Sequence, residues 1–321
     1  MQVRALRSLE NSEWDNFVSY SNSGTIFHKL KFLGYHNKNK FQFLNLAFYK
    51  NGKIVAIIPG GVTDGIYKSP VGASYGSFAT IVDTFNEYEE IVESFLKYSK
   101  ENNFKEIYLT PPPLIYLSKQ NELERFILEY KGFKVKTNLI TNALDLTNIE
   151  KEGEILKVFQ KRLRNDVVKS AKSSLKVEFD DNYKEFYMIL LENKKKFNTL
   201  PTHTYDELLK LKKLCPEELQ LLMAYYKGKA IAGTLLFTCN NTTILTFYIA
   251  HLYKYRHLKA VSRLLRDAVA WANTKNFRWF DLGVSMDTSS KNPMEPSRNL
   301  IFFKEGINSK GFLRTTYYKH L

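Results

Sequence analysis

The sequence predicts an α+β protein (α/β layered) with two similar domains, each a mostly antiparallel sheet flanked by helices. A strand–turn–strand pattern occurs twice, as AFYKNGKIVA from residue 47 and AYYKGKAIA from residue 224. A passage from helix to strand through Asn-Phe also occurs twice, as SKENNFKEIYL from residue 99 and ANTKNFRWFDL from residue 272. Both pairs keep the same order and lie about half the chain apart, which indicates an internal duplication.

The elements of the second half follow in a clear order. QLLMAYY, AIAGTLLFT and TTILTFYIA are three strand-like runs joined by short turns, and AVSRLLRDAVAWANTKN has apolar residues at helical spacing. WFDLGVS then closes the unit as another strand. The first half has the same plan through IVESFLKYSKENNFKEIYL. We therefore expect domains at residues 1–145 and 146–321.

Length and composition exclude several classes of protein. The chain has 321 residues, of which 44% are hydrophobic and 25% charged, so neither disorder nor a small disulfide scaffold fits. No stretch approaches the roughly 18 apolar residues of a membrane span, and the N-terminus lacks an apolar signal region. Cys215 and Cys239 have no metal-type spacing. We expect a reduced, cytoplasmic protein, with the inner face of the membrane as an alternative location.

A basic segment joins the two halves. Thr147 and Glu150 fit a capping box that opens a helix there. The helix is expected to bury one stripe and to expose cations, with Phe159, Leu163, Val167 and Ala171 on the buried side and Lys161, Arg162, Arg164, Lys169, Lys172 and Lys176 on the other. Two interpretations stay open for these cations, a solvated face and a phosphate-binding surface. The net charge of +14 favours a polyanionic partner, namely nucleic acid, nucleotide or anionic membrane.

Most enzyme motifs are absent from the sequence. It contains no GxxxxGK[ST], GxGxxG, GxSxG or HExxH, and its six histidines are scattered. We therefore expect neither a metal site nor a permanently bound cofactor.

Five segments in order resemble the FemAB-like type of GNAT acyltransferases. They are RNDVVKSAKSSLKV (164–177), LPTHTYDELLKL (200–211), FYIA (247–250), FDLGVS (280–285) and NLIFFKEGINSKG (299–311). The resemblance covers most of residues 145–321 and implies tandem GNAT-like domains, the first of them a degenerate repeat. It also implies that the last few residues cross back to the first domain.

The resemblance implies acyl or aminoacyl transfer to an amine, and its Fem members use aminoacyl-tRNA to build peptidoglycan bridges. CoA-binding members carry a glycine loop before a helix that holds the pyrophosphate. HLYKYRHLKAVSR stands in that place and has no glycine. Either CoA binds through the side chains of Arg256, Lys259 and Arg263, or the donor is not CoA.

Acyl transfer requires that an amine loses a proton and that an oxyanion is stabilised. By resemblance Lys304 is the first candidate to stabilise the oxyanion or an anionic substrate group; the alternative is a surface lysine at the end of a strand. His203 is a candidate base or a loop histidine bonded to backbone. Tyr248 either lines the cleft or packs in the core. Asp281 has a site role or forms a structural ion pair, because a buried charge needs a partner.

The candidate substrate-binding residues are Arg164, Lys169, Lys172, Ser285 and Asn299. Taken with the duplication, the Lys304 segment and the basic helix, the resemblance implies an acyltransferase that moves an acyl group from an acyl-CoA type donor onto an amine of a phosphate-bearing cell-envelope or surface-glycan precursor. Its partner would be an anionic small molecule or a lipid-linked precursor, with peripheral membrane contact as an option. The first alternative is a Fem-like enzyme that uses aminoacyl-tRNA on a peptidoglycan precursor. The second is a non-catalytic nucleic-acid-binding protein.

Overall fold

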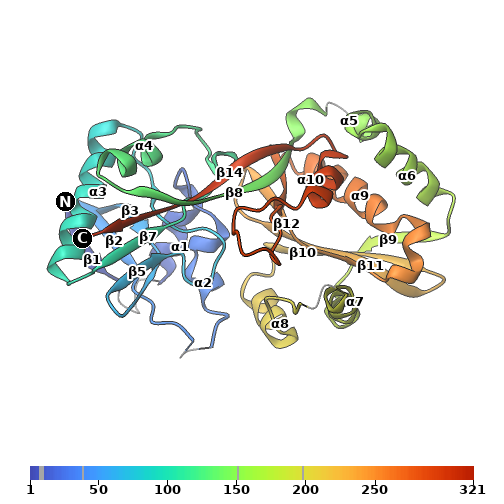
Figure 1. The fold of residues 1–321 in the computed structure, drawn as a ribbon, viewed down its shortest axis with the longest axis horizontal. Helices are drawn as coiled ribbons and strands as arrows, with labels where there is room; N and C mark the ends of the chain where they lie inside the picture. Colours follow the sequence, from blue (N-terminus) through green and yellow to red (C-terminus); the bar gives the residue numbers. More distant parts are fainter. Residues whose placement is uncertain (7–10, 38–39, 150–151, 197–198) are drawn as a thin grey trace. The chain divides into compact units, whose positions relative to one another are not determined.

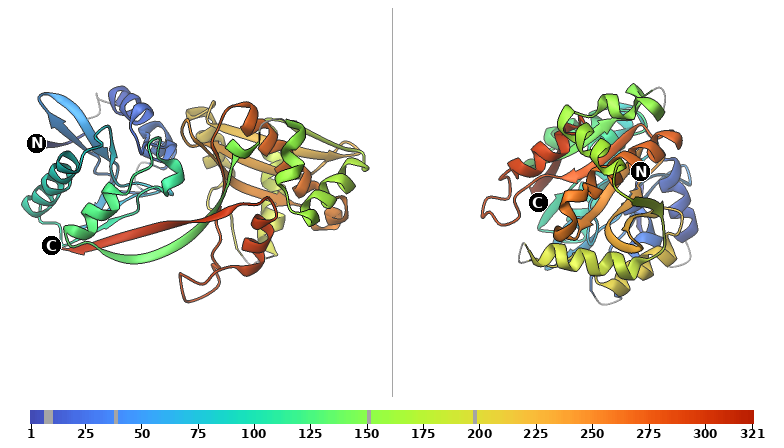
Figure 2. Two further views of the ribbon diagram at one scale, coloured as in Figure 1. Left: turned by 90° about the horizontal axis from the view of Figure 1, so that it is seen from above. Right: turned by 90° about the vertical axis from the view of Figure 1, so that its right-hand side faces the viewer.

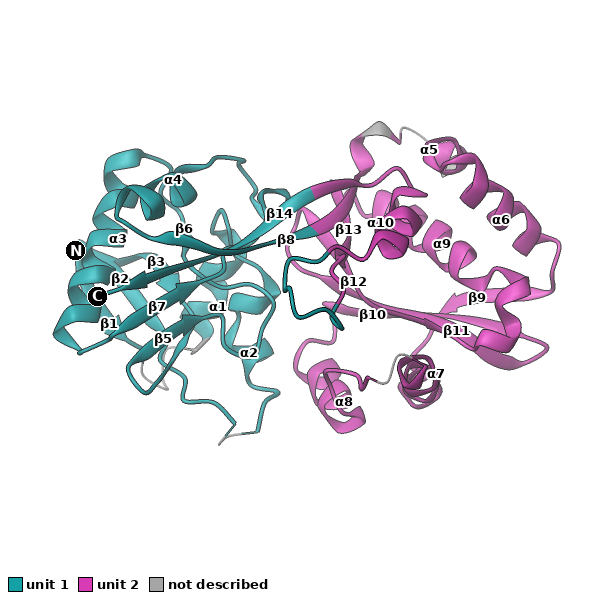
Figure 3. Cartoon of the chain, viewed as in Figure 1, with its two compact units in different colours: residues 1–140, 288–295, 312–321 teal, residues 141–287, 296–311 magenta. Residues whose placement is uncertain are grey.

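The computed structural model describes residues 1–6, 11–37, 40–149, 152–196 and 199–321, and confirms the α+β class. The chain forms two compact units (Figure 3). Unit 1 comprises residues 1–140, 288–295 and 312–321, and unit 2 comprises residues 141–287 and 296–311.

Two long strands have residues in both units, β8 (Lys134–Asp145) and β14 (Lys310–His320). They are neighbours in the strand order and run next to each other (Figures 1 and 2). The boundary expected at residue 145 is the last residue of β8. The last ten residues, 312–321, belong to unit 1.

Unit 1 has a sheet of order β1-β2-β3-β6 and a second group of strands of order β4-β5-β7-β14-β8. Its other strands are β1 (Gln2–Ala5), β2 (Leu46–Lys50), β3 (Lys53–Ile58), β4 (Gly61–Thr63), β5 (Ile66–Ser69), β6 (Ala79–Thr80) and β7 (Glu106–Leu109). Its helices are α1 (Asn11–Tyr20), α2 (Leu30–Leu33), α3 (Phe85–Glu101) and α4 (Leu123–Tyr130).

The core of unit 1 lies between α3, α4 and one face of the second strand group. Ile91 and Phe95 of α3 are fully buried with Tyr67 of β5 and Ile107 of β7. The predicted hairpin at residue 47 is confirmed as β2–β3. Asn51 and Gly52 form its turn at φ values of 52° and 76°, which suits a two-residue turn that needs positive φ.

Unit 2 contains one sheet of order β8-β13-β12-β11-β10-β9. Its strands are β9 (Leu175–Phe179), β10 (Leu219–Tyr226), β11 (Lys229–Thr238), β12 (Thr243–His251) and β13 (Trp279–Val284). Its helices are α5 (Ile155–Val158), α6 (Lys161–Ala171), α7 (Tyr183–Lys195), α8 (Tyr205–Leu214), α9 (Ala260–Thr274) and α10 (Arg298–Glu305). The three predicted strands, the helix and the closing strand are therefore confirmed.

Helices cover both faces of this sheet. In Figure 1, α6 and α9 lie on one side of β10 and β11, and α7 and α8 lie on the other. Leu264 and Leu265 of α9 are fully buried against Ala232 of β11. A Cβ atom on Gly233 would lie 2.7 Å from the Phe186 ring of α7, so only glycine permits this close approach.

The basic segment differs from its prediction. The helix is α6, and Gln160 precedes it as N-cap. Thr147 lies in an earlier short turn, where its backbone N–H and hydroxyl donate to Asp145, and Glu150 lies outside the described residues. Phe159, Leu163 and Val167 are buried as predicted, but Ala171 is exposed and Ser170 is buried instead. The reason is that Leu163, Val167 and Ser170 follow the i, i+4, i+7 spacing of a helix face.

The six predicted cations are all exposed, and Lys172 and Lys176 lie beyond the helix. Among the described residues, no helix combines the length and the apolar character needed to cross a membrane.

Candidate active site

Two parallel strands in unit 2 pair only briefly. Thr243–Leu245 of β12 pairs with Trp279–Asp281 of β13, and neither strand continues that pairing, although β12 extends to His251. Phe247 forms a bulge, because Leu236 pairs with Thr246 while Leu235 pairs with Tyr248. Strand edges that part in this way leave backbone N–H and C=O groups available to a ligand.

Two further features mark the place where the strands part. Gly283 has a φ of 74°, and a Cβ atom there would lie 3.8 Å from the Thr246 carbonyl oxygen. Thr246 is 7% exposed, and its buried hydroxyl has no hydrogen-bond partner among the described residues. A buried hydroxyl without a partner costs stability, so it indicates a position where a ligand atom could be bound.

Helix α10 brings Lys304 to the end of β13. The buried ammonium donates to the carbonyl oxygens of Gly283 (2.6 Å) and Val284 (2.9 Å) and to the Ser285 hydroxyl (2.9 Å). That hydroxyl donates to Asn142 Oδ1 at 2.5 Å. The alternative of a surface lysine at the end of a strand is wrong, since Lys304 lies in a helix and is buried.

The charge of Lys304 is set by two opposed effects. Burial lowers the pKa of its ammonium to about 8, and the negative charge of Asp281 acts in the opposite direction. At neutral pH the ammonium form therefore predominates. All three N–H donors of the ammonium form hydrogen bonds, so in this state Lys304 holds the Gly283–Ser285 segment in place and adds a positive charge next to it.

Asp281 is fully buried on β13. Its Oδ1 accepts from the Thr141 hydroxyl at 2.6 Å and from the Gly283 N–H at 2.8 Å. These bonds hold the left-handed turn at Gly283 against β8, beside Lys304. Of the predicted site residues, Lys304, Ser285 and Asp281 are thus brought together.

His203 and Tyr248 form a second buried pair. The backbone N–H of His203 donates to Tyr248 Oη at 3.3 Å, and His203 Nδ1 lies 3.0 Å from the same oxygen. A capping box between Thr204 and Glu207 begins α8 directly after His203 and so fixes this loop. Burial raises the pKa of Tyr248, so its hydroxyl stays protonated at neutral pH.

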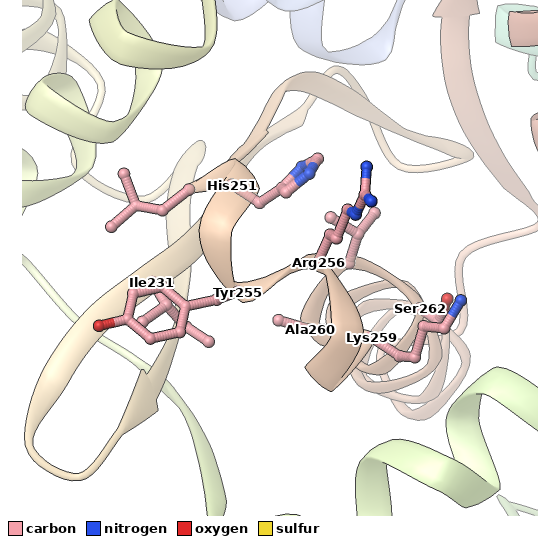
Figure 4. A pocket seen from close by; sticks show the side chains of 9 residues that line it. Ile231, His251, Tyr255, Arg256, Lys259, Ala260 and Ser262 are labelled. Carbon is pink, nitrogen blue, oxygen red and sulfur yellow. The ribbon is translucent and has the colours of Figure 1, made fainter.

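A small pocket lies at the beginning of α9. It has a volume of about 140 Å³ and is lined by Ile231, His251, Leu252, Tyr255, Arg256, Lys259, Ala260, Val261 and Ser262. In Figure 4 the nitrogen atoms of His251 and Arg256 extend to the same side of the pocket. Typical ligand pockets measure about 300–1,000 Å³, so this one suits a phosphate group better than a whole nucleotide. A helix N-terminus with cations beside it attracts such an anion.

Lys259 is the N-cap of α9 and lines this pocket. Its φ of 58° and ψ of 32° are left-handed, a conformation that glycine adopts without strain. Its ammonium lies 3.1 Å from Asp166 of α6. Arg263 is not among the residues that line this pocket, and its Nε donates to Asp267 at 2.8 Å, one helical turn away.

The remaining candidates lie apart from these groups. Arg164 and Lys169 are exposed on α6, and Lys172 is exposed at its C-cap. Asn299 is exposed in the first turn of α10, whereas Lys304 is buried in the last. The residues that sequence reasoning missed are Thr141, Asn142, Thr246 and Gly283. Three are polar residues inside apolar strands, and that mismatch was visible in the sequence.

Comparisons with known proteins identify a domain in the second half of the chain. Residues 174–289 match the family model described as an acetyltransferase (GNAT) domain. A search of curated proteins found no match. The chain therefore contains a GNAT-type acyltransferase domain, as the sequence predicts.

Solved structures show a similar fold over the whole chain. FemX superposes with a TM-score of 0.75 at 12% identity, over 100% of this chain and 98% of that one. The C-terminal domain of a putative lysylphosphatidylglycerol synthetase from Agrobacterium fabrum has a TM-score of 0.62 at 14% identity, over 97% and 92%. A tandem GNAT protein from the clavulanic acid biosynthesis pathway has a TM-score of 0.55 at 7% identity, over 99% and 98%. The fold is therefore that of tandem GNAT-like proteins.

Proposed function

We propose that the protein transfers an acyl group from an acyl-CoA type donor onto an amine of a phosphate-bearing cell-envelope or surface-glycan precursor. The observation that carries this proposal is the parted strand pair β12 and β13, with the unpartnered Thr246 hydroxyl where the strands separate. An extended donor arm with amide groups can bond to such edges as an added strand would. The pocket at the beginning of α9 lies on the same unit and suits a donor phosphate.

In the proposed reaction, the bonds and protons balance as follows. The amine nitrogen attacks the thioester carbonyl carbon, a C–N bond forms and the C–S bond breaks. The amine loses one proton and the leaving thiolate gains one. Backbone N–H groups of β12 beyond Leu245 are candidates to stabilise the oxyanion, since fixed donors in a dry site are effective there. Tyr248 is the candidate proton donor to the thiolate, with His203 as its partner at 3.0 Å.

Lys304 acts in this proposal as a positioning residue. Its ammonium sets the path of Gly283–Ser285, and its charge favours an anionic group near the end of β13. The name of one structural neighbour, lysylphosphatidylglycerol synthetase, describes a product with an aminoacyl group on a phosphate-bearing lipid. That chemistry supports an envelope precursor as the acceptor.

The test separates donor binding from transfer. Acetyl-CoA and longer acyl-CoAs are titrated while the unfolding temperature is recorded, and release of the CoA thiol is followed with amino sugars and their nucleotide-linked forms as acceptors. We expect a rise in the unfolding temperature that grows with ligand concentration. Arg256→Ala should weaken this rise, because its guanidinium lies at the phosphate pocket. Wild-type protein with neither a temperature shift nor thiol release would exclude an acyl-CoA donor.

A second candidate donor is aminoacyl-tRNA. The exposed cations of α6, which include Lys161, Arg164 and Lys169, favour it, because they form a surface suited to phosphates. In that case tRNA should bind with an affinity that falls steeply with salt, while acyl-CoA should not raise the unfolding temperature. Charge reversal of Arg164 and Lys169 should then weaken tRNA binding. Unchanged binding by that variant would remove α6 from the tRNA site.

A further inference from the structure

Within the described part of unit 1, no helix packs on one face of the second strand group. Alternate residues on these strands, among them Tyr67, Ile107 and Tyr317, are buried with α3 and α4. The residues between them point to the opposite face, because successive side chains of a strand alternate. In Figure 3, β5, β7, β14 and β8 lie in front, and no helix of unit 1 crosses them. This surface is called the open face below.

A row of four side chains crosses the open face, one from each strand. Lys68 of β5 is in register with Tyr108 of β7, which is in register with Tyr318 of β14. The two tyrosine rings are nearly parallel, at 23°, with centroids 6.2 Å apart. The Lys68 ammonium lies 5.8 Å from the Tyr108 centroid, and the Lys136 ammonium of β8 lies 5.4 Å from that of Tyr318.

A pocket opens beside this row. It measures about 400 Å³ and is lined by Ile66, Lys68, Ser69, Pro70, Tyr108, Thr110 and Thr316. The hydroxyls of Thr110 and Thr316 lie 2.9 Å apart at its wall. The volume falls within the range of about 300–1,000 Å³ that is typical for bound small groups. A nucleobase or a similar ring therefore fits here.

Arg314 extends the positive charge along β14. It lies two residues before Thr316 on the same face, and its Nη2 donates to the Ser74 carbonyl at 2.7 Å. Its Nε is buried and has no hydrogen-bond partner among the described residues. An unsatisfied guanidinium donor is costly unless an acceptor such as a phosphate oxygen binds it. An acidic group, Glu106, also lies on the open face, where it accepts from the Tyr108 hydroxyl at 2.8 Å and lies 3.4 Å from His320.

We propose that the open face of unit 1 binds single-stranded nucleic acid. Aromatic rings on an uncovered sheet, flanked by cations, are the arrangement with which proteins stack bases and hold the backbone of a single strand. Tyr108 and Tyr318 supply the rings, while Lys68, Lys136 and Arg314 supply charge for phosphates. The residues of this surface all belong to unit 1, and the inference does not depend on which donor or acceptor is used.

The test measures binding of a fluorescently labelled eight-nucleotide RNA to the full chain by anisotropy. The double variant Tyr108→Leu, Tyr318→Leu keeps apolar bulk but removes both rings, and it should bind at least about 30-fold more weakly. Tyr108→Phe, Tyr318→Phe keeps the rings and should bind within about threefold of wild type. The matched control is Lys97→Ala, Lys100→Ala, two exposed lysines of α3 on the side of the strand group away from the open face, and it should leave the affinity unchanged.

The lysines are tested by salt dependence. For single strands each phosphate contact contributes about 0.7 to the slope of log K against log salt. Lys68→Ala, Lys136→Ala should therefore reduce the slope by about 1.4. A DNA strand of the same sequence is compared with the RNA. A DNA affinity within tenfold of the RNA affinity would indicate that the surface does not recognise the ribose hydroxyl, and a larger difference in favour of RNA would indicate that it does. Both results agree with the proposal.

Three outcomes would overturn the inference. In the first, the leucine pair binds RNA as well as wild type while its thermal unfolding is unchanged. In the second, only the α3 control, Lys97→Ala, Lys100→Ala, loses binding. In the third, duplex RNA or a neutral oligosaccharide binds as tightly as the single strand. None of these outcomes bears on acyl transfer, so the two proposals fail separately.

Discussion

The Lys304→Met variant tests the central feature of the candidate site. Methionine keeps the length of the side chain but removes the ammonium that bonds to Gly283, Val284 and Ser285. Two buried carbonyl oxygens then lose their donor, while Ser285 keeps its bond to Asn142. The perturbation is therefore confined to one charge and its three bonds.

The size of the effect follows from two opposed contributions. Hydrogen bonds to a charged group contribute about 1.5–3 kcal/mol each, so the three together contribute roughly 5–9 kcal/mol. Burial works against them: lowering the pKa of Lys304 from 10.5 to about 8 corresponds to about 3 kcal/mol. We expect Lys304→Met to lower the free energy of unfolding by about 2–6 kcal/mol. For a domain of this size that is a fall in the unfolding temperature of roughly 5–20 °C.

The pH dependence supplies a second, independent readout. Because the pKa of Lys304 is lower in the folded protein, the unfolded state binds more protons between about pH 8 and 10.5. Wild-type stability should therefore rise with pH in this window relative to the methionine variant, by up to about 3 kcal/mol. Below pH 8 the difference should be constant.

The assay is urea unfolding at pH 7, 8.5 and 10, with Lys310→Met as control. Lys310 is exposed and bonds only to the exposed Asn308 side chain, so its loss should cost less than about 1 kcal/mol. Equal stability of Lys304→Met and Lys310→Met at pH 7, with no widening at pH 10, would refute the burial and bonding of Lys304. If acyl transfer is established, Lys304→Met should also lower it, because the Gly283 turn shifts.

Three further predictions concern other groups. Tyr248→Phe leaves the buried His203 N–H without its acceptor, so the free energy of unfolding should fall by about 1–2 kcal/mol. If the Tyr248 hydroxyl donates a proton, acyl transfer should also slow about 100-fold or more, and unchanged transfer would exclude that role. Lys259→Gly removes the strain of a left-handed lysine but loses its partly exposed ion pair with Asp166, so the free energy of unfolding in urea should change by less than about 1 kcal/mol. The variant should bind acyl-CoA more tightly, and weaker binding would show that Lys259 holds the donor. Burial raises the pKa of Glu124 to about 7, so the stability of the wild-type protein should fall by about 3 kcal/mol as the pH rises from 4.5 to 7. Glu124→Gln should abolish this pH dependence, and a pH dependence that persists in the variant would belong to another group.

Local patterns in the sequence determined the secondary structure and the repeat. The hairpins at residues 47 and 224, the helix α9 and the strand β13 follow from hydrophobic spacing and turn residues. These features depend on neighbours within a few positions, so no tertiary information is needed. The match of motif order likewise identified the acyltransferase domain, whose matched residues 174–289 include Ser285 and Asp281, and it singled out Lys304 beyond them.

The burial and the hydrogen-bond partners of those residues depend on tertiary packing. Whether Lys304 is exposed or buried depends on where α10 packs, and that packing gave it three acceptors from β13. Arg263 and Lys259 are both basic residues near one loop, yet one pairs within its helix and the other lines the pocket. The Arg263–Asp267 pair follows from i, i+4 spacing on a helix, whereas the place of Lys259 at the pocket depends on tertiary packing.

The remaining features, the parted strands and the row of side chains on the open face, depend on how distant strands pair. The parting of β12 from β13 is a property of two strands whose paired residues are more than thirty positions apart. The row from Lys68 to Lys136 joins four strands, and Tyr318 reaches it from the end of the chain. Spacing along a chain determines which face a side chain takes, whereas pairing between distant strands determines which side chains meet there.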